Sequence, residues 1–141
     1  MNTFDELIDS LCVSLRQSGR FDGVNVKRAY LGETVQAAPS GSEVVAEAAA
    51  VSLTGAALGG LVENGKTGKR MSLSVKFYLS CPIRCSEQNC MDLFDRLCAA
   101  LLFDSGYDVR ALACSSASVD PDRHTYTRTA TAVLDMLYLK S

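Results

Sequence analysis

The stretch Gly60–Thr67, GLVENGKT, has the residue types and spacing of a phosphate-binding loop, G-x-x-x-x-G-K-[ST]. In such a loop the backbone N–H groups of a glycine-rich turn surround the phosphates of a nucleotide. A helix that begins at the Lys-Ser/Thr pair points its positive N-terminal end at the same phosphates. The residues that follow Thr67 must therefore form a helix if this stretch is to bind a nucleotide.

The residues that follow the motif have the pattern of a strand instead. Over residues 71–80, MSLSVKFYLS, apolar residues alternate with mostly polar ones, a period of two rather than 3.6. Since a strand cannot direct helical N–H groups at a phosphate, we expect no nucleotide and no other cofactor. Asn64-Gly65 is a favoured hairpin turn, so Gly60–Arg70, GLVENGKTGKR, is predicted to be the polar tip of a long β-hairpin.

The cysteines are a second set of residues that could do chemistry, by binding a metal ion or by forming disulfides. From Cys81 to Cys98 their spacing is C-x3-C-x4-C-x7-C, which lacks the paired C-x2-C of common zinc sites. We place Cys81 and Cys85 in a loop, and two thiolates do not complete a tetrahedral zinc shell. We expect free thiols and no metal site, with Cys12, Cys90 and Cys98 packed as small hydrophobes in apolar helical stripes. The six cysteines are Cys12, Cys81, Cys85, Cys90, Cys98 and Cys114.

A nucleophile, a base and an orienting carboxylate can be drawn from Cys114, His124 and either Asp120 or Asp122, which lie near one another in the sequence. Asp120–Arg123, DPDR, has the composition of a turn between antiparallel strands, in which acidic side chains accept hydrogen bonds from backbone N–H groups. We therefore interpret His124, the single histidine, as an exposed residue beside a turn. The sequence predicts no catalytic residues, and we expect that the protein is not an enzyme.

Helical and strand patterns divide the chain into seven predicted elements. Residues 3–18, with a capping box at Thr3 and Glu6, and residues 87–103, which Ser86 can cap, carry apolar residues at helical spacing. Residues 43–61 are interpreted as a strand, although their alanines favour a helix. The remaining predicted strands are residues 24–31, 71–80, 107–119 and 124–140. This order predicts the α+β class, a mainly antiparallel sheet packed by two helices in the order α-β-β-β-α-β-β.

Length and charge limit the domain count and the partners. At 141 residues, 48% of them hydrophobic and 21% charged, the chain is predicted to form a single domain over residues 1–141. A net charge of −2 and a pI of about 5.3, without a basic run, argue against a nucleic acid partner. No apolar stretch approaches the ~20 residues of a membrane span, and the N-terminus MNTFDELIDS is acidic rather than a basic leader. We therefore expect no membrane partner and synthesis in the cytosol.

Taken together, the segments resemble one known family. They are the N-terminal helix FDELIDSLCVSL, the strands VKRAYLGETVQAAPSG and EVVAEAAAVSLTG, the strand pair meeting at ENGKTGKR, the helix CMDLFDRLCAALL and the closing hairpin VDPDRHTYTRTATAVLDMLYL. In size and order this set resembles the tail-terminator, or tail-completion, proteins of long-tailed bacteriophages, which are small α+β proteins. The resemblance covers nearly the whole chain and rests on the order of elements rather than on a signature motif.

The resemblance implies a structural protein of the virion tail, assembled in the cytoplasm of the bacterial host. Copies of such a protein form a ring, typically of six subunits, that caps the tail tube and joins it to the head connector. The implied partners are the chain itself, the tail tube protein and the connector protein. A ring needs sheet edges and loops that pair between subunits. We expect the projecting hairpin tip to lie in an interface through Glu63, Asn64, Lys66, Lys69 and Arg70.

Three alternatives remain open. Another head-tail joining protein or minor tail protein would share these features. A small nucleotide-binding enzyme would use Gly60–Thr67, and Mg-ATP or Mg-GTP would then raise its melting temperature. A free-standing ligand-binding domain would be a monomer or dimer with a deep apolar pocket, whereas a terminator would form a ring with an open lumen.

Overall fold

The computed structural model describes residues 4–28, 41–53, 61–63, 66–84 and 87–139. The predicted α+β class and the order of helices and strands are confirmed. The predicted strand over residues 43–61 is described as a strand over Glu43–Leu53, and a separate short strand, Leu61–Glu63, lies in the predicted hairpin tip. The predicted strand over residues 107–119 is divided into two, Asp108–Cys114 and Ser118–Asp120. The elements are α1 (Phe4–Gln17), β1 (Asn25–Arg28), β2 (Glu43–Leu53), β3 (Leu61–Glu63), β4 (Lys66–Pro82), α2 (Glu87–Ala99), η1 (Ala100–Asp104), β5 (Asp108–Cys114), β6 (Ser118–Asp120) and β7 (Thr125–Leu139).

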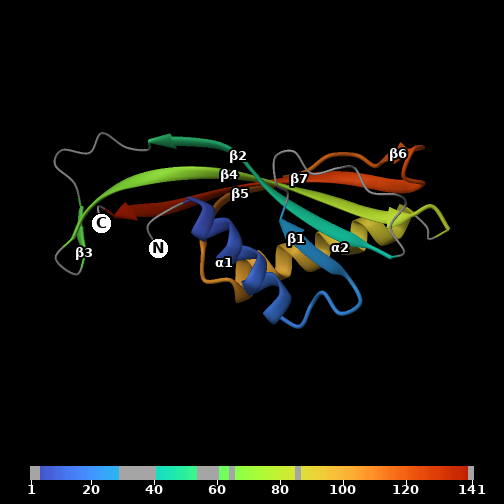
Figure 1. Ribbon diagram of the computed structural model, residues 1–141, viewed down its shortest axis with the longest axis horizontal. Helices are drawn as coiled ribbons and strands as arrows, with labels where there is room; N and C mark the ends of the chain where they lie inside the picture. Colours follow the sequence, from blue (N-terminus) through green and yellow to red (C-terminus); the bar gives the residue numbers. More distant parts are fainter. Residues whose placement is uncertain (1–3, 29–40, 54–60, 64–65, 85–86, 140–141) are drawn as a thin grey trace.

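The described strands form one sheet with the order β1-β2-β4-β7-β5, in which β3 pairs with β4 and β6 pairs with β7. β1 and β2 run parallel, and the other pairs are antiparallel. The longest pair is β4 with β7, in register from Gly68↔Leu139 to Pro82↔Thr125. Both α1 and α2 lie on the same side of this sheet (Figure 1). The fold therefore has two layers, and the helices cover one face of the sheet.

The alternation of β4 sorts its side chains between the two faces of the sheet. Lys76 is exposed on the open face, whereas its neighbours Val75 and Phe77 are fully buried on the face that carries the helices. Burying a side chain of this size stabilises the fold by about 1.5–3 kcal/mol relative to leaving it exposed. The buried residues that complete this core include Leu7, Ile8, Leu11, Leu15, Val44, Ala46, Leu73, Leu79, Leu93, Leu97, Leu101, Ala130, Ala132 and Leu134.

α1 forms where its apolar residues recur every three or four positions, so that one side of the helix packs on the sheet. Its predicted cap, Thr3, lies outside the described residues. The helix ends at Gln17, and Gly19 follows with a φ of 77°, a left-handed conformation that glycine adopts without strain. Ser18 Oγ donates a hydrogen bond to the carbonyl of Leu15 at 2.7 Å and satisfies one of the free carbonyls of the last turn.

The second helix differs from its prediction at the C-terminal end. Residues 87–103 were predicted as one α-helix with Leu101 and Leu102 on its apolar side, but α2 ends at Ala99 and continues as the π-helical turn η1. The wider π turn shifts the register of the side chains. As a result Leu101 is buried, whereas Leu102 and Phe103 are exposed. The predicted cap, Ser86, lies outside the described residues. None of the described helices is long and apolar enough to cross a membrane.

Candidate functional site

The segment with the phosphate-loop spacing is part of a β-hairpin in the structure. β3 pairs antiparallel with the start of β4 through Leu61↔Gly68, Val62↔Thr67 and Glu63↔Lys66. The predicted hairpin is confirmed, although the turn residues Asn64 and Gly65 themselves lie outside the described residues. Lys66 and Thr67 are the first residues of β4, at the position where a phosphate-binding loop has the first turn of its helix. The backbone geometry that binds phosphate is therefore not present at Lys66 and Thr67.

The hairpin extends the sheet beyond its helical layer. We use the term arm for β3 together with Lys66–Arg70 of β4 and Leu137–Leu139 of β7, which are paired in register. Among the described elements, neither α1 nor α2 extends over this end of the sheet (Figure 1). At about 3.4 Å per residue, Lys66–Arg70 spans roughly 17 Å. The arm is therefore a narrow ribbon, and such ribbons are marginally stable without a partner surface.

The predicted interface residues occupy the arm. Glu63 faces Lys66 across the hairpin, Lys69 pairs with Tyr138 in register, and Arg70 pairs with Leu137. Arg70 is exposed. The fifth predicted residue, Asn64, lies outside the described residues, and the structure contains no second subunit, so their role in an interface remains a prediction.

At the base of the arm, Asp135 of β7 is held by groups from the neighbouring strands. Arg110 on β5 donates two hydrogen bonds to its carboxylate, from Nη2 to Oδ1 at 2.7 Å and from Nε to Oδ2 at 3.2 Å. Ser72 Oγ on β4 donates a third at 3.0 Å. The hydrogen bond from Arg110 is the main cause that lowers the pKa of Asp135, with further contributions from Ser72 and Arg70. The carboxylate thus joins three adjacent strands where the arm begins.

A second polar cluster lies toward the other end of the open face. Glu43, at the start of β2, is buried and has an exposed fraction of only 4%. Arg123, in the turn before β7, donates a hydrogen bond from Nη2 to Glu43 Oε1. Lys27 Nζ lies 3.7 Å from Glu43 Oε2. Glu43 and Arg123 are 80 residues apart in the sequence, and no local pattern could have predicted their contact.

The cysteines include one clear error of prediction. Cys81 was placed in a loop, but it lies in β4 and is fully buried. The alternation of Leu79, Ser80 and Cys81 continues that of the preceding strand and was the signal that could have placed it. Cys12 and Cys90 are buried as predicted, whereas Cys98 is only half-buried. Among the residues that the structure describes, no group of three or more His, Cys, Asp and Glu side chains is arranged to hold a metal ion.

The turn before β7 has the predicted chemistry. Asp120 Oδ1 accepts hydrogen bonds from the backbone N–H groups of Asp122, at 3.1 Å, and Arg123, at 3.3 Å. The exposed His124 that follows has a φ of 52°, and its carbonyl accepts a hydrogen bond from the N–H of Ile83 at 2.9 Å. His124 therefore completes a tight connection into β7.

Cys114 and His124 are too far apart to act together as a nucleophile and a base. Cys114 on β5 pairs in register with Ala130 of β7. His124 directly precedes β7 and is separated from Ala130 by six positions of extended chain. At about 3.3 Å per residue this separation is roughly 20 Å, well beyond hydrogen-bond reach. The fold therefore does not bring together the cysteine and histidine of the catalytic arrangement that the sequence allowed.

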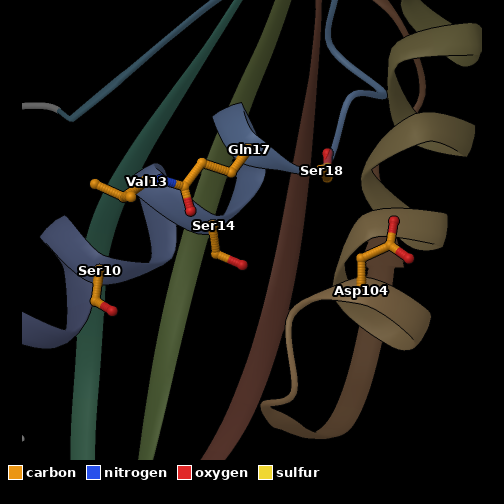
Figure 2. Close-up of a pocket in the computed structure, with 6 residues that line it drawn as sticks. All are labelled: Ser10, Val13, Ser14, Gln17, Ser18 and Asp104. Atoms are coloured by element: carbon orange, nitrogen blue, oxygen red, sulfur yellow. The ribbon is translucent and has the colours of Figure 1, made fainter.

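A shallow hollow of about 370 Å³ lies between α1 and the end of η1. Figure 2 shows its α1 side chains on one side and Asp104 on the other. Arg20 Nε donates a hydrogen bond to Asp104 Oδ2, so the one carboxylate in the lining already has a cationic partner. Among the residues that the structure describes, the lining contains hydroxyl groups but no histidine or cysteine, and consists of Ser10, Val13, Ser14, Gln17, Ser18 and Asp104.

Exposed apolar residues lie in the lining of this hollow or directly precede one of its lining residues in the chain. Phe103 and Leu102, which directly precede Asp104, have exposed fractions of 79% and 51%, and Val13 in the hollow is 43% exposed. A single exposed apolar residue is ordinary in a folded protein, but adjacent ones beside a hollow are typical of a contact surface. Leu102 and Phe103 lie in the π-helical turn, which sequence patterns did not predict.

The comparisons with known proteins assign no family to this architecture. A scan against protein-family models finds no match to the chain, and a search of curated proteins finds none either. A functional proposal therefore rests on the sequence resemblance and on the geometry of the arm, the polar clusters and the exposed apolar residues.

Proposed function

We propose that the chain is a structural subunit of a bacteriophage tail, a tail terminator. Its copies form a ring that caps the tail tube and connects it to the head. Other head-tail joining proteins or minor tail proteins are the nearest alternatives, because they require the same kind of subunit contacts. The observation that carries this proposal is the arm, a paired ribbon of strands that continues the sheet past the helices that cover it.

The arm has the features of a segment that is completed by a partner. The sequence of the arm combines apolar and charged residues. The apolar residues are Leu61, Val62, Leu137 and Leu139, and the charged ones include Lys66, Lys69 and Arg70. A two- or three-stranded ribbon without a covering layer gains little stability from its own contacts. A neighbouring subunit would supply the missing surface, and the charged residues would form the polar rim that sets register and partner choice.

The alternative of a nucleotide-binding enzyme has less support. Lys66 and Thr67 belong to a strand, and the hydroxyl-lined hollow lies beside α1 rather than beside the hairpin. Because Cys114 and His124 are far apart, His124 cannot act as the base for a Cys114 nucleophile. No described observation favours a second function over the structural one.

The first test of the proposal is the assembly state of the purified protein. We expect native mass spectrometry and electron microscopy to show a closed ring, typically of six subunits as the resemblance implies. Replacing Glu63–Arg70 by a tight Asn-Gly turn should leave a folded subunit that no longer forms the ring. Asp95→Ala, a change at an exposed residue of α2, is the matched control and should assemble normally. A monomer or dimer at all concentrations would contradict the proposal.

A further inference from the structure

Cys81 and Cys90 bring two thiols into contact where the end of β4 meets the first turns of α2. Their Sγ atoms are 3.0 Å apart, and both side chains are fully buried. The sulfur atoms of a disulfide are about 2.0 Å apart, so the two atoms need to approach by roughly 1 Å.

The surroundings hold both sulfur atoms in place. Cys81 pairs in register with Tyr126 of β7, and Cys90 Sγ donates a hydrogen bond to the carbonyl of Tyr126 at 3.1 Å. Cys90 Sγ also lies 3.9 Å from the carbonyl oxygen of Leu79, and in its contact with Cys81 either thiol can be the donor. The same two strands that form the core therefore fix the position of the pair.

We propose that Cys81 and Cys90 are an oxidisable pair that closes into a disulfide on exposure to a small-molecule disulfide such as oxidised glutathione. One cysteine thiolate attacks the glutathione disulfide and forms a mixed disulfide, which releases the first glutathione thiol. The second cysteine attacks the protein sulfur of the mixed disulfide and releases the second glutathione thiol. The two protein thiols lose two electrons and two protons, and the two glutathione thiols gain them.

Burial makes the reduced Cys81–Cys90 pair slow to oxidise. Burial is the main cause that raises the pKa of the Cys90 thiol to about 12, with a further contribution from its hydrogen bond with Cys81. Since the thiolate is the reactive species, exchange at neutral pH is slow and waits for local opening of the first turns of α2. The pair therefore stays reduced in a compartment that contains reduced thiols and closes on long exposure outside it.

Closing the pair ties α2 to the end of β4. The disulfide links residues on either side of the β4–α2 connection, and it restricts the unfolded chain more than the folded one. We expect the melting temperature to rise by roughly 5 °C on oxidation and to return on reduction. This inference does not depend on the proposed function in a phage tail.

The test is a thiol count on the whole protein after several hours with oxidised glutathione, followed by denaturation. We expect the six thiols to fall to four through the loss of one pair, with a mass loss of two hydrogen atoms. Peptide mapping should find Cys81 joined to Cys90. Cys81→Ser and Cys90→Ser should each prevent the cross-link, whereas Cys12→Ala, which removes an equally buried thiol from α1, should leave it intact.

Two results would overturn the proposal. One is a full count of six thiols in the folded protein under conditions in which the unfolded chain is oxidised. The other is a peptide map that joins different cysteines and leaves Cys81 and Cys90 as thiols. Should the serine variants fail to fold, the peptide map of the unaltered chain decides by itself.

Discussion

The β4–β7 ribbon passes through two different environments. Between Leu73 and Cys81, one side of β4 is fully buried beneath the helices, and the matching part of β7 contributes Ala130, Ala132 and Leu134 to the same core. From Lys66 to Arg70 the ribbon continues as the arm, away from the helical layer. The same strand pair thus serves the core at one end and faces outward at the other.

This difference separates the residues that fold the subunit from those available for assembly. The core end depends on dispersion and burial, which a single subunit supplies for itself. The arm lies at the end of the sheet that neither helix covers, and Asp135 with its partners marks the boundary between the two. Substitutions at the two ends should therefore differ in what they change: stability at the core, and assembly at the arm.

The largest expected effect is at the core end. Phe77→Ala should lower the free energy of unfolding by about 3–5 kcal/mol, because it removes a fully buried ring from the centre of β4. Lys76→Ala, at the exposed neighbour, should change it by less than about 0.5 kcal/mol. Chemical denaturation measures both values, and equal effects would mean that the two faces of β4 do not differ as described.

The polar cluster on the open face should have an intermediate effect. Glu43→Ala leaves Arg123 and Lys27 without their shared carboxylate, and loss of a hydrogen-bonded partner in such a site costs about 1–3 kcal/mol. Urea denaturation midpoints measure the loss. Glu47→Ala, on the same strand with a more exposed side chain, is the control and should cost less. A negligible loss at Glu43 would show that the cluster does not hold the turn to the sheet.

The Asp135 site should give a smaller effect that depends on pH. Because its folded pKa is lowered, Asp135 contributes stability above the ordinary carboxyl pKa, and this contribution disappears as the pH falls through the lowered value. Arg110→Ala removes the main cause of the shift. We therefore expect this variant to be less stable than the unaltered chain at pH 7 and equally stable at pH 2, as measured by denaturation midpoints. A difference that persists unchanged at pH 2 would assign the effect of Arg110 to packing.

The smallest expected effects are at the arm. Lys66→Ala and Thr67→Ala should each change the free energy of unfolding by no more than about 0.5 kcal/mol, since neither lies beneath the helical layer. Mg-ATP and Mg-GTP should leave the melting temperature of the unaltered chain unchanged. A rise with either nucleotide that Lys66→Ala abolishes would restore the enzyme alternative.

Local sequence patterns predicted the elements well and their ends less well. The alternation of residues 71–80 was sufficient to predict a strand after Gly65–Thr67. Because a phosphate-binding loop needs a helix at that point, the same prediction argued against nucleotide binding. The strand begins earlier, at Lys66, because pairing with β3 and β7 extends it through a segment with no alternation of its own. Pairing between distant segments sets that boundary, and a local window does not contain it.

The contacts that organise the open face could not be predicted from the sequence. Glu43 meets Arg123 across 80 residues, and Arg110 meets Asp135 across 25.

The contact of Cys81 with Cys90 depends on where β4 ends, which was placed too early. The π-helical turn at η1 depends on packing of Ala100 and Leu101 against the core, so helical periodicity placed Leu102 on the wrong side.

The most direct test of the central claim is the length of phage tail tubes assembled with and without this protein. Tail tube protein should be assembled together with the other tail components, and tube lengths measured by electron microscopy. The account predicts tubes of uncontrolled length when the protein is absent or when Glu63–Arg70 is replaced by a tight Asn-Gly turn. It predicts normal lengths with the Asp95→Ala control. Tubes of normal length in the complete absence of the protein would contradict its assignment as a tail terminator.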